Sequence, residues 1–356
     1  MLAQWSHRCM TRFVCKREFS DECPPPPTKF QTKHLKEIGK RQHDEKISVV
    51  GVGQVGIACS AFILQRRLTN HLVFMDIRKD WIKAEALDFL HASSTTGSQK
   101  ITATVDGKEM AGSKYVVITT GLRPTKDQSR LDVAQKTTDM IVKIMPPLLE
   151  YCPNATFIVV SNPADVITWL IQKLGKLPKH RCLSTGCHLD SLRFRYFISK
   201  RLGVAPSAVE GYIIGEHGNS SVPVWSSVMV GGIALLRIMP DIGTESDKEK
   251  WSKVHEQVVK GASTVSSIKT YTNWAIGMTV SDVISALKDN SGRILSVATD
   301  VQGFMGIEDS VVLSLPCILT SDGIAQVVEL PLTDFEKDML KKSVDTLIKA
   351  QCSIKF

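Results

Sequence analysis

The sequence has no pair of cysteines at C-x-x-C spacing and no uninterrupted apolar run of about 20 residues. Its nine cysteines are scattered and odd in number, so neither a zinc knuckle nor a redox dithiol is predicted, and a reducing compartment is the simpler inference. The longest mostly apolar stretch, residues 49–64, is interrupted by glycines. It therefore indicates a strand, a turn and a helix, and a membrane-spanning helix is excluded.

Dense clusters of basic residues are also missing from most of the chain. The formal net charge is +8, but residues 1–46 carry ten Lys and Arg against six Asp and Glu, which is half of the excess. Because nucleic-acid binding needs a clustered positive surface, we do not expect it. The chain has 356 residues, of which 43% are hydrophobic and 22% charged, and this predicts two globular domains with a substantial core.

Residues 1–45 are predicted to form an N-terminal extension. The first 17 residues contain four basic side chains and no acid, and apolar residues recur there at helical spacing. This pattern is typical of a mitochondrial transit peptide. An extension without a targeting function explains the same residues equally well, so mitochondrial and cytoplasmic locations both stay open. Four prolines at 24–27 then indicate a stiff spacer before a charged arm.

Strand-like and helix-like segments alternate between residues 46 and 185. This alternation is typical of an α/β fold with a doubly wound parallel sheet, in which ligands bind at the carboxyl ends of the strands. Residues 186–356 mix longer helices with hairpin-like strands and predict a second, α+β domain that carries the catalytic groups. The predicted strands are 47–52, 71–76, 115–120 and 156–161 in the first domain, and 294–301, 311–319 and 324–329 in the second.

A glycine-rich turn follows the first predicted strand. The segment Gly51-Val52-Gly53-Gln54-Val55-Gly56 has G-x-G-x-x-G spacing and opens a helix, so its amides and the helix N-terminus can hold a pyrophosphate. Asp76 ends the next strand, where a carboxylate accepts hydrogen bonds from ribose hydroxyls and repels a 2′-phosphate. In this context a tight turn alone is the weaker explanation. We therefore predict a Rossmann-type domain over residues 46–185 that binds NAD in preference to NADP.

Two short stretches bring together a proton-transfer group and a carboxylate-binding group. Asp190 and Arg193 are three residues apart and share one face of a helix, whereas His217 stands beside glycines at a turn. A carboxylate directed at an imidazole fixes its tautomer and raises its pKa, and an arginine can bind a substrate carboxylate through two hydrogen bonds. Together with the glycine loop, these residues predict hydride transfer to or from a small carboxylic acid.

Further polar positions are expected at the same edge of the sheet. Arg130 lies in the polar segment 121–131 and could stabilise charge on a substrate oxygen. Asn162 ends another predicted strand, and Thr272 offers a hydroxyl beside the apolar Trp274. Taken alone, each is explained as well or better by a structural role. Cys187 also lies nearby in the sequence, and we expect a buried thiol there and not a nucleophile.

Six motifs occur in order along the chain: VVGVGQVG (49–56), SRLDVAQ (129–135), SNPADVIT (161–168), LDSLRFRY (189–196), GEHGNSSVPVW (215–225) and YTNWAIG (271–277). From about residue 46 to the C-terminus, the chain thus resembles the lactate/malate dehydrogenase family, and the segment around Trp274 resembles the lactate branch. The resemblance implies reversible hydride transfer between L-lactate and NAD⁺, giving pyruvate and NADH. It also implies a homotetramer, with the N-terminal arm contributing to assembly.

The resemblance further implies roles for individual residues. Asp190 would orient His217, the proton donor and acceptor, while Arg193 would hold the substrate carboxylate and Arg130 would polarise its carbonyl. Two side chains, Asn162 and Thr272, would line the substrate pocket. No metal ion is expected. The cofactor would contact the glycine loop (Gly51, Gly53, Gln54, Val55 and Gly56) together with Asp76, Gly121, Arg123 and Asn162.

Some positions depart from the family pattern. Pro124 stands where lactate enzymes have glutamine and malate enzymes arginine, and its side chain can form no hydrogen bond. Leu192 and His188 replace a small residue and an asparagine near Asp190. None of these departures removes a group that performs the chemistry. They leave two alternatives open: a dehydrogenase of another L-2-hydroxy acid, and a weakly active or inactive paralogue that binds NAD.

Overall fold

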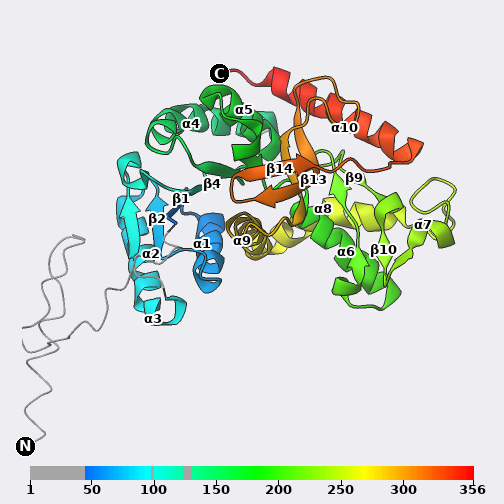
Figure 1. The fold of residues 1–356 in the computed structure, drawn as a ribbon, viewed down its shortest axis with the longest axis horizontal. Coiled ribbons are helices and arrows are strands. Elements are labelled where there is room, and N and C mark those ends of the chain that lie inside the picture. Colours follow the sequence, from blue (N-terminus) through cyan, green and yellow to red (C-terminus); the bar gives the residue numbers. More distant parts are fainter. Residues whose placement is uncertain (1–44, 98–99, 123–129) are drawn as a thin grey trace, which may run out of the picture. The chain divides into compact units, whose positions relative to one another are not determined.

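The computed structural model describes residues 45–97, 100–122 and 130–356, except for the side chains of Arg130 and Leu131. Its largest element is a nine-stranded sheet with helices on both faces (Figure 1). Six parallel strands follow one another in the order β3-β2-β1-β4-β5-β6, the order of a doubly wound dinucleotide-binding sheet, so the predicted fold class is confirmed. These strands are β1 (Ile47–Val50), β2 (His71–Met75), β3 (Lys100–Thr104), β4 (Tyr115–Ile118), β5 (Thr156–Val159) and β6 (Cys182–Ser184).

Three antiparallel strands from the C-terminal half continue the same sheet. The connection is a single pairing between Ala298 of β12 and Ser184 of β6. The sequence predicts these three strands but not that they extend the dinucleotide-binding sheet. They are β12 (Ile294–Asp300), β13 (Val312–Thr320) and β14 (Gly323–Val327).

The sequence-based prediction missed β3 and β6. In β3 only Ile101 is buried, because the strand forms the edge of the sheet and shows no apolar run. β6 was missed because it has only three residues, too few to show a strand pattern. The predicted strands that begin at Ile47 and His71 are correct but end earlier than expected. The first of them ends early because the chain already turns at Gly51, with a φ of +89°.

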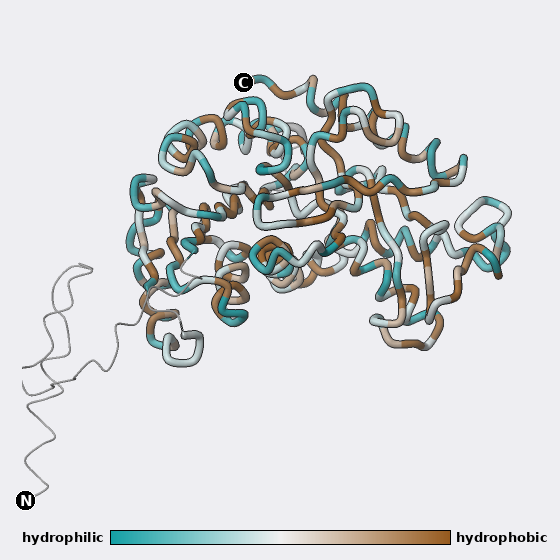
Figure 2. The backbone as a smooth tube through the Cα atoms, in the orientation of Figure 1, coloured by the Kyte–Doolittle hydropathy of each residue, from teal (hydrophilic) through white to brown (hydrophobic). Residues whose placement is uncertain are grey.

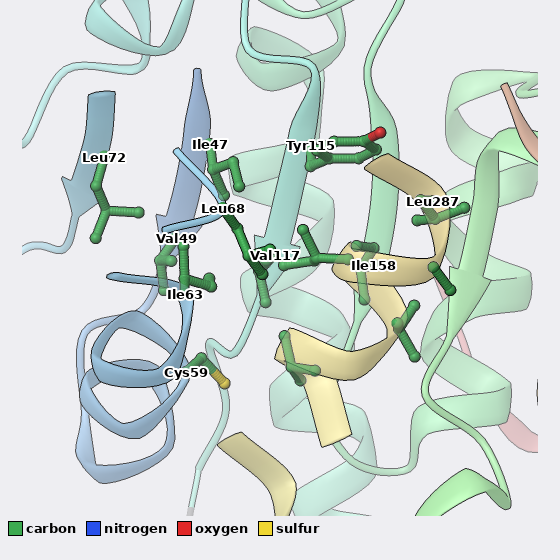
Figure 3. Close-up of a cluster of buried hydrophobic side chains, with 14 of the residues drawn as sticks. Ile47, Val49, Cys59, Ile63, Leu68, Leu72, Tyr115, Val117, Ile158 and Leu287 are labelled. Atoms are coloured by element: carbon green, nitrogen blue, oxygen red, sulfur yellow. The ribbon is translucent and has the colours of Figure 1, made fainter. Parts of the chain in front are cut away.

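Helices cover the two faces of the sheet and build two hydrophobic clusters. On one face α1 (Gln54–Gln65), α2 (Lys79–His91) and α9 (Trp274–Lys288) pack against the strands. Figure 3 shows Cys59 and Ile63 of α1 in this cluster, together with Val49 and Val117 of the sheet. On the other face lie α4 (Arg130–Tyr151) and α5 (Ala164–Gly175). Hydrophobic residues accordingly concentrate along the central strands (Figure 2).

Helix α9 approaches α1 closely. A Cβ atom at Gly277 would lie 2.8 Å from the carbonyl oxygen of Ala58, so only glycine allows this distance between the two helices. The ring of Trp274, at the start of α9, meets the ring of Phe62 edge to face. The segment before α9 is thereby tied to the helix that follows the glycine loop.

Most of the remaining elements belong to the C-terminal half of the sequence. Helix α6 (His188–Leu202) packs on α8 (Ser252–Lys269), and α10 (Asp334–Ser353) begins with a capping box formed by Thr333 and Glu336. No helix in the described part of the chain has the length and apolarity that a bilayer-spanning segment requires. The short elements are α3 (Ser93–Thr96), α7 (Leu235–Ile238), β7 (Val209–Glu210), β8 (Ile213–Ile214), β9 (Val222–Pro223), β10 (Met229–Val230) and β11 (Ile233–Ala234).

Candidate active site

The glycine turn between β1 and α1 is tightly packed on its protein side and open on the other. A Cβ atom at Gly51 would lie 2.6 Å from the Thr120 amide nitrogen, and one at Gly56 would clash with the Gly51 carbonyl oxygen. At Gly53, in contrast, a Cβ atom would meet no described atom within 4 Å. The first and third glycines thus let the turn pack against β4 and α1, while the second leaves free space above the helix N-terminus.

The open side of this turn fits an anionic group. Helix α1 begins at Gln54, has no side-chain cap at Gly53 and no acid in its first turn. The amides of Gln54 and Val55 belong to the helix end, where no preceding turn can accept their hydrogen bonds. With the partial positive charge of the helix N-terminus, they suit the pyrophosphate of a dinucleotide.

Asp76 follows β2 directly and lies beside this turn. Its Oδ2 accepts a hydrogen bond from the Val52 amide at 2.8 Å, so the carboxylate is held next to the glycine loop. It also forms an ion pair with Arg78, which the sequence alone does not predict. Burial would raise the pKa of Asp76, but the hydrogen bonds and charge of Arg78, together with the Val52 amide, outweigh it and lower the pKa.

His217 lies on the turn between β8 and β9, which two elements hold in place. Gly215 has a φ of +84° and exchanges both backbone hydrogen bonds with Ser314 of β13, each 2.9 Å long. A side chain at Gly215 would collide with Ser343 of α10, 2.7 Å away. Gly215 therefore lets the turn lie between the sheet and α10, and this fixes the position of the backbone that leads to His217.

The structure brings Asp190, Arg193 and His217 together. Asp190 Oδ2 lies 2.6 Å from His217 Nδ1, and Arg193 Nη1 donates a hydrogen bond to Asp190 Oδ1 at 2.9 Å. Since an ionised carboxylate only accepts hydrogen bonds, Nδ1 carries the proton and Nε2 is left to exchange a proton with a ligand. The side chain of His217 is 28% exposed, whereas that of Asp190 is only 8% exposed.

Charges in this group shift two pKa values in opposite directions. The charge of Asp190, and then its hydrogen bond, raise the pKa of His217 above its usual value although burial opposes this. Burial of Asp190 would raise its own pKa, but the charges and hydrogen bonds of His217 and Arg193 outweigh it and lower the pKa. An ionised Asp190 beside a protonatable His217 is the arrangement that general acid–base catalysis requires.

Asp165 is a second carboxylate that sequence reasoning missed. It lies in the first turn of α5, is 3% exposed and accepts a hydrogen bond from the His217 backbone amide at 2.8 Å. Its other oxygen is buried without a hydrogen-bond partner in the described part of the chain, and burial raises the pKa of Asp165 to about 7. The sequence did offer one sign of Asp165, because it is the only acid among the apolar residues at the start of α5.

A second histidine near the site does not have the same properties. His255 of α8 contacts the Ser221 hydroxyl through Nε2 at 3.0 Å. Burial lowers the pKa of His255 to about 4, so this ring stays neutral near pH 7. His217 is therefore the better proton donor of the two.

Two sequence patterns of one family match the chain in succession. Residues 45–184 match the lactate/malate dehydrogenase NAD binding domain, and residues 187–355 match the lactate/malate dehydrogenase alpha/beta C-terminal domain. The chain belongs to the lactate/malate dehydrogenase family. The resemblance seen in the six motifs is thereby confirmed, and NAD is the cofactor of the domain that contains the glycine turn.

Similar members of the lactate/malate dehydrogenase family are L-lactate dehydrogenase B chains. Those of Monodelphis domestica and Homo sapiens are each 46% identical to this chain over 312 residues, which cover 88% of this chain and 93% of theirs. The B chain of Squalus acanthias is 43% identical over 328 residues, covering 91% of this chain and 98% of its own.

The other residues to which the family resemblance gives a role differ in position and exposure. Asn162 is exposed and lies two residues before α5, the helix that supplies Asp165, whereas Thr272 is half-buried in the connection from α8 to α9. None of the hydrogen bonds among the described residues joins either of them to His217. Gly121 is exposed after β4. Arg123 lies outside the described residues, and Arg130 begins α4 with an undescribed side chain, so their roles stay predictions.

Two positions that depart from the family pattern can be located. His188 is buried at the start of α6, and its Nε2 lies 3.0 Å from Asp282 of α9. Leu192 is 39% exposed and points away from the core. Cys187 is fully buried, as expected, and burial raises its pKa well above the usual value, which disfavours the nucleophilic thiolate.

Proposed function

We propose that this chain is an NAD-dependent L-lactate dehydrogenase, which transfers hydride reversibly between L-lactate and NAD⁺. The observation that carries the proposal is the Asp190–His217 pair with Arg193 on the same helix turn, in a chain with the family's NAD binding domain. The similarity to L-lactate dehydrogenase B chains supports lactate and pyruvate as the substrate pair.

Each residue of the group has a separate task in this reaction. When bound, the nicotinamide ring supplies or accepts the hydride. His217 holds a proton on Nδ1 through Asp190 and uses Nε2 to accept the hydroxyl proton of lactate, or to donate a proton to the carbonyl oxygen of pyruvate. Arg193 uses Nη1 for Asp190, and its remaining donors can bind the substrate carboxylate.

The protonation of His217 predicts how the rates of pyruvate reduction and lactate oxidation depend on pH. Pyruvate reduction needs protonated His217, so its kcat/KM is greatest at low pH and falls as the pH rises through the pKa of His217. Lactate oxidation needs neutral His217 and rises over the same range. Because Asp190 raises the pKa of His217, both changes occur at higher pH than they would for an ordinary histidine.

Substrate choice is tested by offering pyruvate, oxaloacetate and a bulkier 2-oxo acid in parallel to the full chain with NADH. Pyruvate is expected to be reduced faster than oxaloacetate, because Pro124 cannot pair with a second carboxylate. The variant Pro124→Gln is expected to raise kcat/KM for pyruvate. If the bulkier acid is the best substrate of the unmodified chain, the enzyme is a dehydrogenase of another L-2-hydroxy acid.

We further propose a homotetramer, as implied by the family resemblance, and import into mitochondria directed by the basic, acid-poor first 20 residues. Sedimentation of the purified chain at four times the protomer mass is expected, and a monomer would contradict the first proposal. A fluorescent reporter fused to residues 1–20 is expected in mitochondria. If the reporter stays in the cytosol, the N-terminal residues are an extension without a targeting function.

A further inference from the structure

The carboxylate that faces the adenosine end of the dinucleotide site is fully engaged by its own neighbour. Asp76 Oδ1 accepts hydrogen bonds from the Arg78 amide and from Arg78 Nε, both 3.0 Å long. Asp76 Oδ2 accepts from the Val52 amide at 2.8 Å and from Arg78 Nη2 at 2.9 Å. A carboxylate offers about four acceptor positions, so none is left over for the two ribose hydroxyls.

The guanidinium of Arg78 is held in place on several sides. Its Nη2 also donates to the Val52 carbonyl at 2.9 Å, and its carbon atom lies 5.2 Å from the centre of the Trp81 ring. The Trp81 indole nitrogen donates to the same carbonyl at 3.1 Å. In the described part of the chain, no group accepts a hydrogen bond from Arg78 Nη1, and the side chain is 47% exposed. The guanidinium is thus fixed just after β2, and the two donors on Nη1 are used by no group in the described part of the chain.

We propose that Arg78 makes this site accept a dinucleotide with a 2′-phosphate, so that the site binds NADPH in addition to NADH. This inference rests on the proposed dehydrogenase function. In an NAD-selective site of this fold, the free carboxylate at the end of β2 binds the ribose and repels a 2′-phosphate, whereas a nearby arginine accommodates that phosphate. Here Arg78 neutralises the charge of Asp76 and presents Nη1 to a phosphate, which charge-assisted hydrogen bonds to guanidinium favour.

The arrangement predicts opposite effects of Arg78 on the two dinucleotides. NADH must compete with Arg78 for the oxygens of Asp76, so Arg78 weakens NADH binding. NADPH gains a contact to Nη1 and meets less repulsion, so Arg78 strengthens NADPH binding. A substitution that removes the Arg78 guanidinium should therefore lower the Kd for NADH and raise the Kd for NADPH, and both changes alter the ratio of the two constants in the same direction.

The test is a titration of the full chain with NADH and with NADPH, followed by protein fluorescence, in the unmodified chain and in Arg78→Leu. We expect the ratio of the NADPH Kd to the NADH Kd to rise at least about tenfold, or about 1.4 kcal/mol, with NADH bound more tightly and NADPH more weakly. Lys79→Leu is the matched control, because it removes an equal charge from the next, exposed residue. Its ratio should stay as in the unmodified chain.

The possible outcomes separate this inference from the proposed function. If NADH binds but NADPH does not, or if Arg78→Leu leaves the ratio unchanged, the inference is wrong while the dehydrogenase proposal stands. If neither dinucleotide binds, both are wrong. Should Arg78→Leu fail to fold, Arg78→Lys replaces it. Lysine cannot hold both oxygens of Asp76, so the ratio is expected to move in the same direction by a smaller factor.

Discussion

Replacing Asp190 by asparagine should slow the enzyme strongly and move its pH profile. Both oxygens of Asp190 are in use, Oδ2 by His217 Nδ1 at 2.6 Å and Oδ1 by Arg193 Nη1 at 2.9 Å. An asparagine has only one acceptor oxygen, so its amide group would face a second donor on either His217 or Arg193. Either Arg193 therefore loses its hydrogen bond, or His217 must carry its proton on Nε2 so that Nδ1 accepts from the asparagine amide group, and the negative charge is lost in every case.

The size of the effect follows from the distance between the charges. Two unit charges about 4 Å apart interact by about 4 kcal/mol at an effective dielectric constant of about 20, which equals about 3 pKa units. We expect the pKa of His217 to fall by about 1–3 units and kcat to fall by about 10²–10⁴, the usual range for general acid–base catalysis.

The assay is kcat/KM for pyruvate as a function of pH, followed by NADH absorbance. His217 must be protonated for this direction, so the fall in kcat/KM with rising pH should occur at lower pH in Asp190→Asn than in the unmodified enzyme. Unchanged NADH binding would show that the variant is folded. A variant with the pH profile and rate of the unmodified enzyme would refute the assigned role of Asp190.

Three further substitutions test the glycine turn and the last helix. Gly53→Ala places a methyl group in open space, so we expect an unchanged Tm but NADH binding weakened at least about tenfold; unaltered binding would contradict the site. Gly56→Ala drives a methyl group against the Gly51 carbonyl, and urea unfolding should show a loss of about 1–3 kcal/mol or more. Thr333→Ala removes a capping box and should cost about 1 kcal/mol in the same assay. Thr346→Ala, exposed on the same helix, is its control and should change stability by less than about 0.5 kcal/mol.

Features with a local sequence pattern could be predicted well. The glycine spacing after β1 reports the turn directly, because Gly51 needs its positive φ and Gly56 has no room for a side chain. Asp190 and Arg193 could be placed on one helix face from their spacing alone. The contact of Asp190 with His217 was implied by the chemistry of the two groups, and the structure brings them within 2.6 Å.

Features that depend on distant parts of the chain could not be predicted. Asp165 contacts the His217 amide across 52 positions, and nothing in its immediate sequence indicates that partner. The pairing of β12 with β6 rests on one residue from each strand, so no periodic pattern reports it. The effect of Arg78 on Asp76 depends on how the chain turns after β2, and no sequence pattern indicates it.

The most direct test of the account compares the full chain with the variant His217→Asn in NADH oxidation by pyruvate, with NADH binding measured on both proteins. The unmodified chain is expected to reduce pyruvate, and the variant is expected to bind NADH equally well but turn over about 10²–10⁴ times more slowly. If the variant is as fast as the unmodified chain, His217 is not the proton donor. If the unmodified chain binds NADH but does not reduce pyruvate, the chain is not a lactate dehydrogenase.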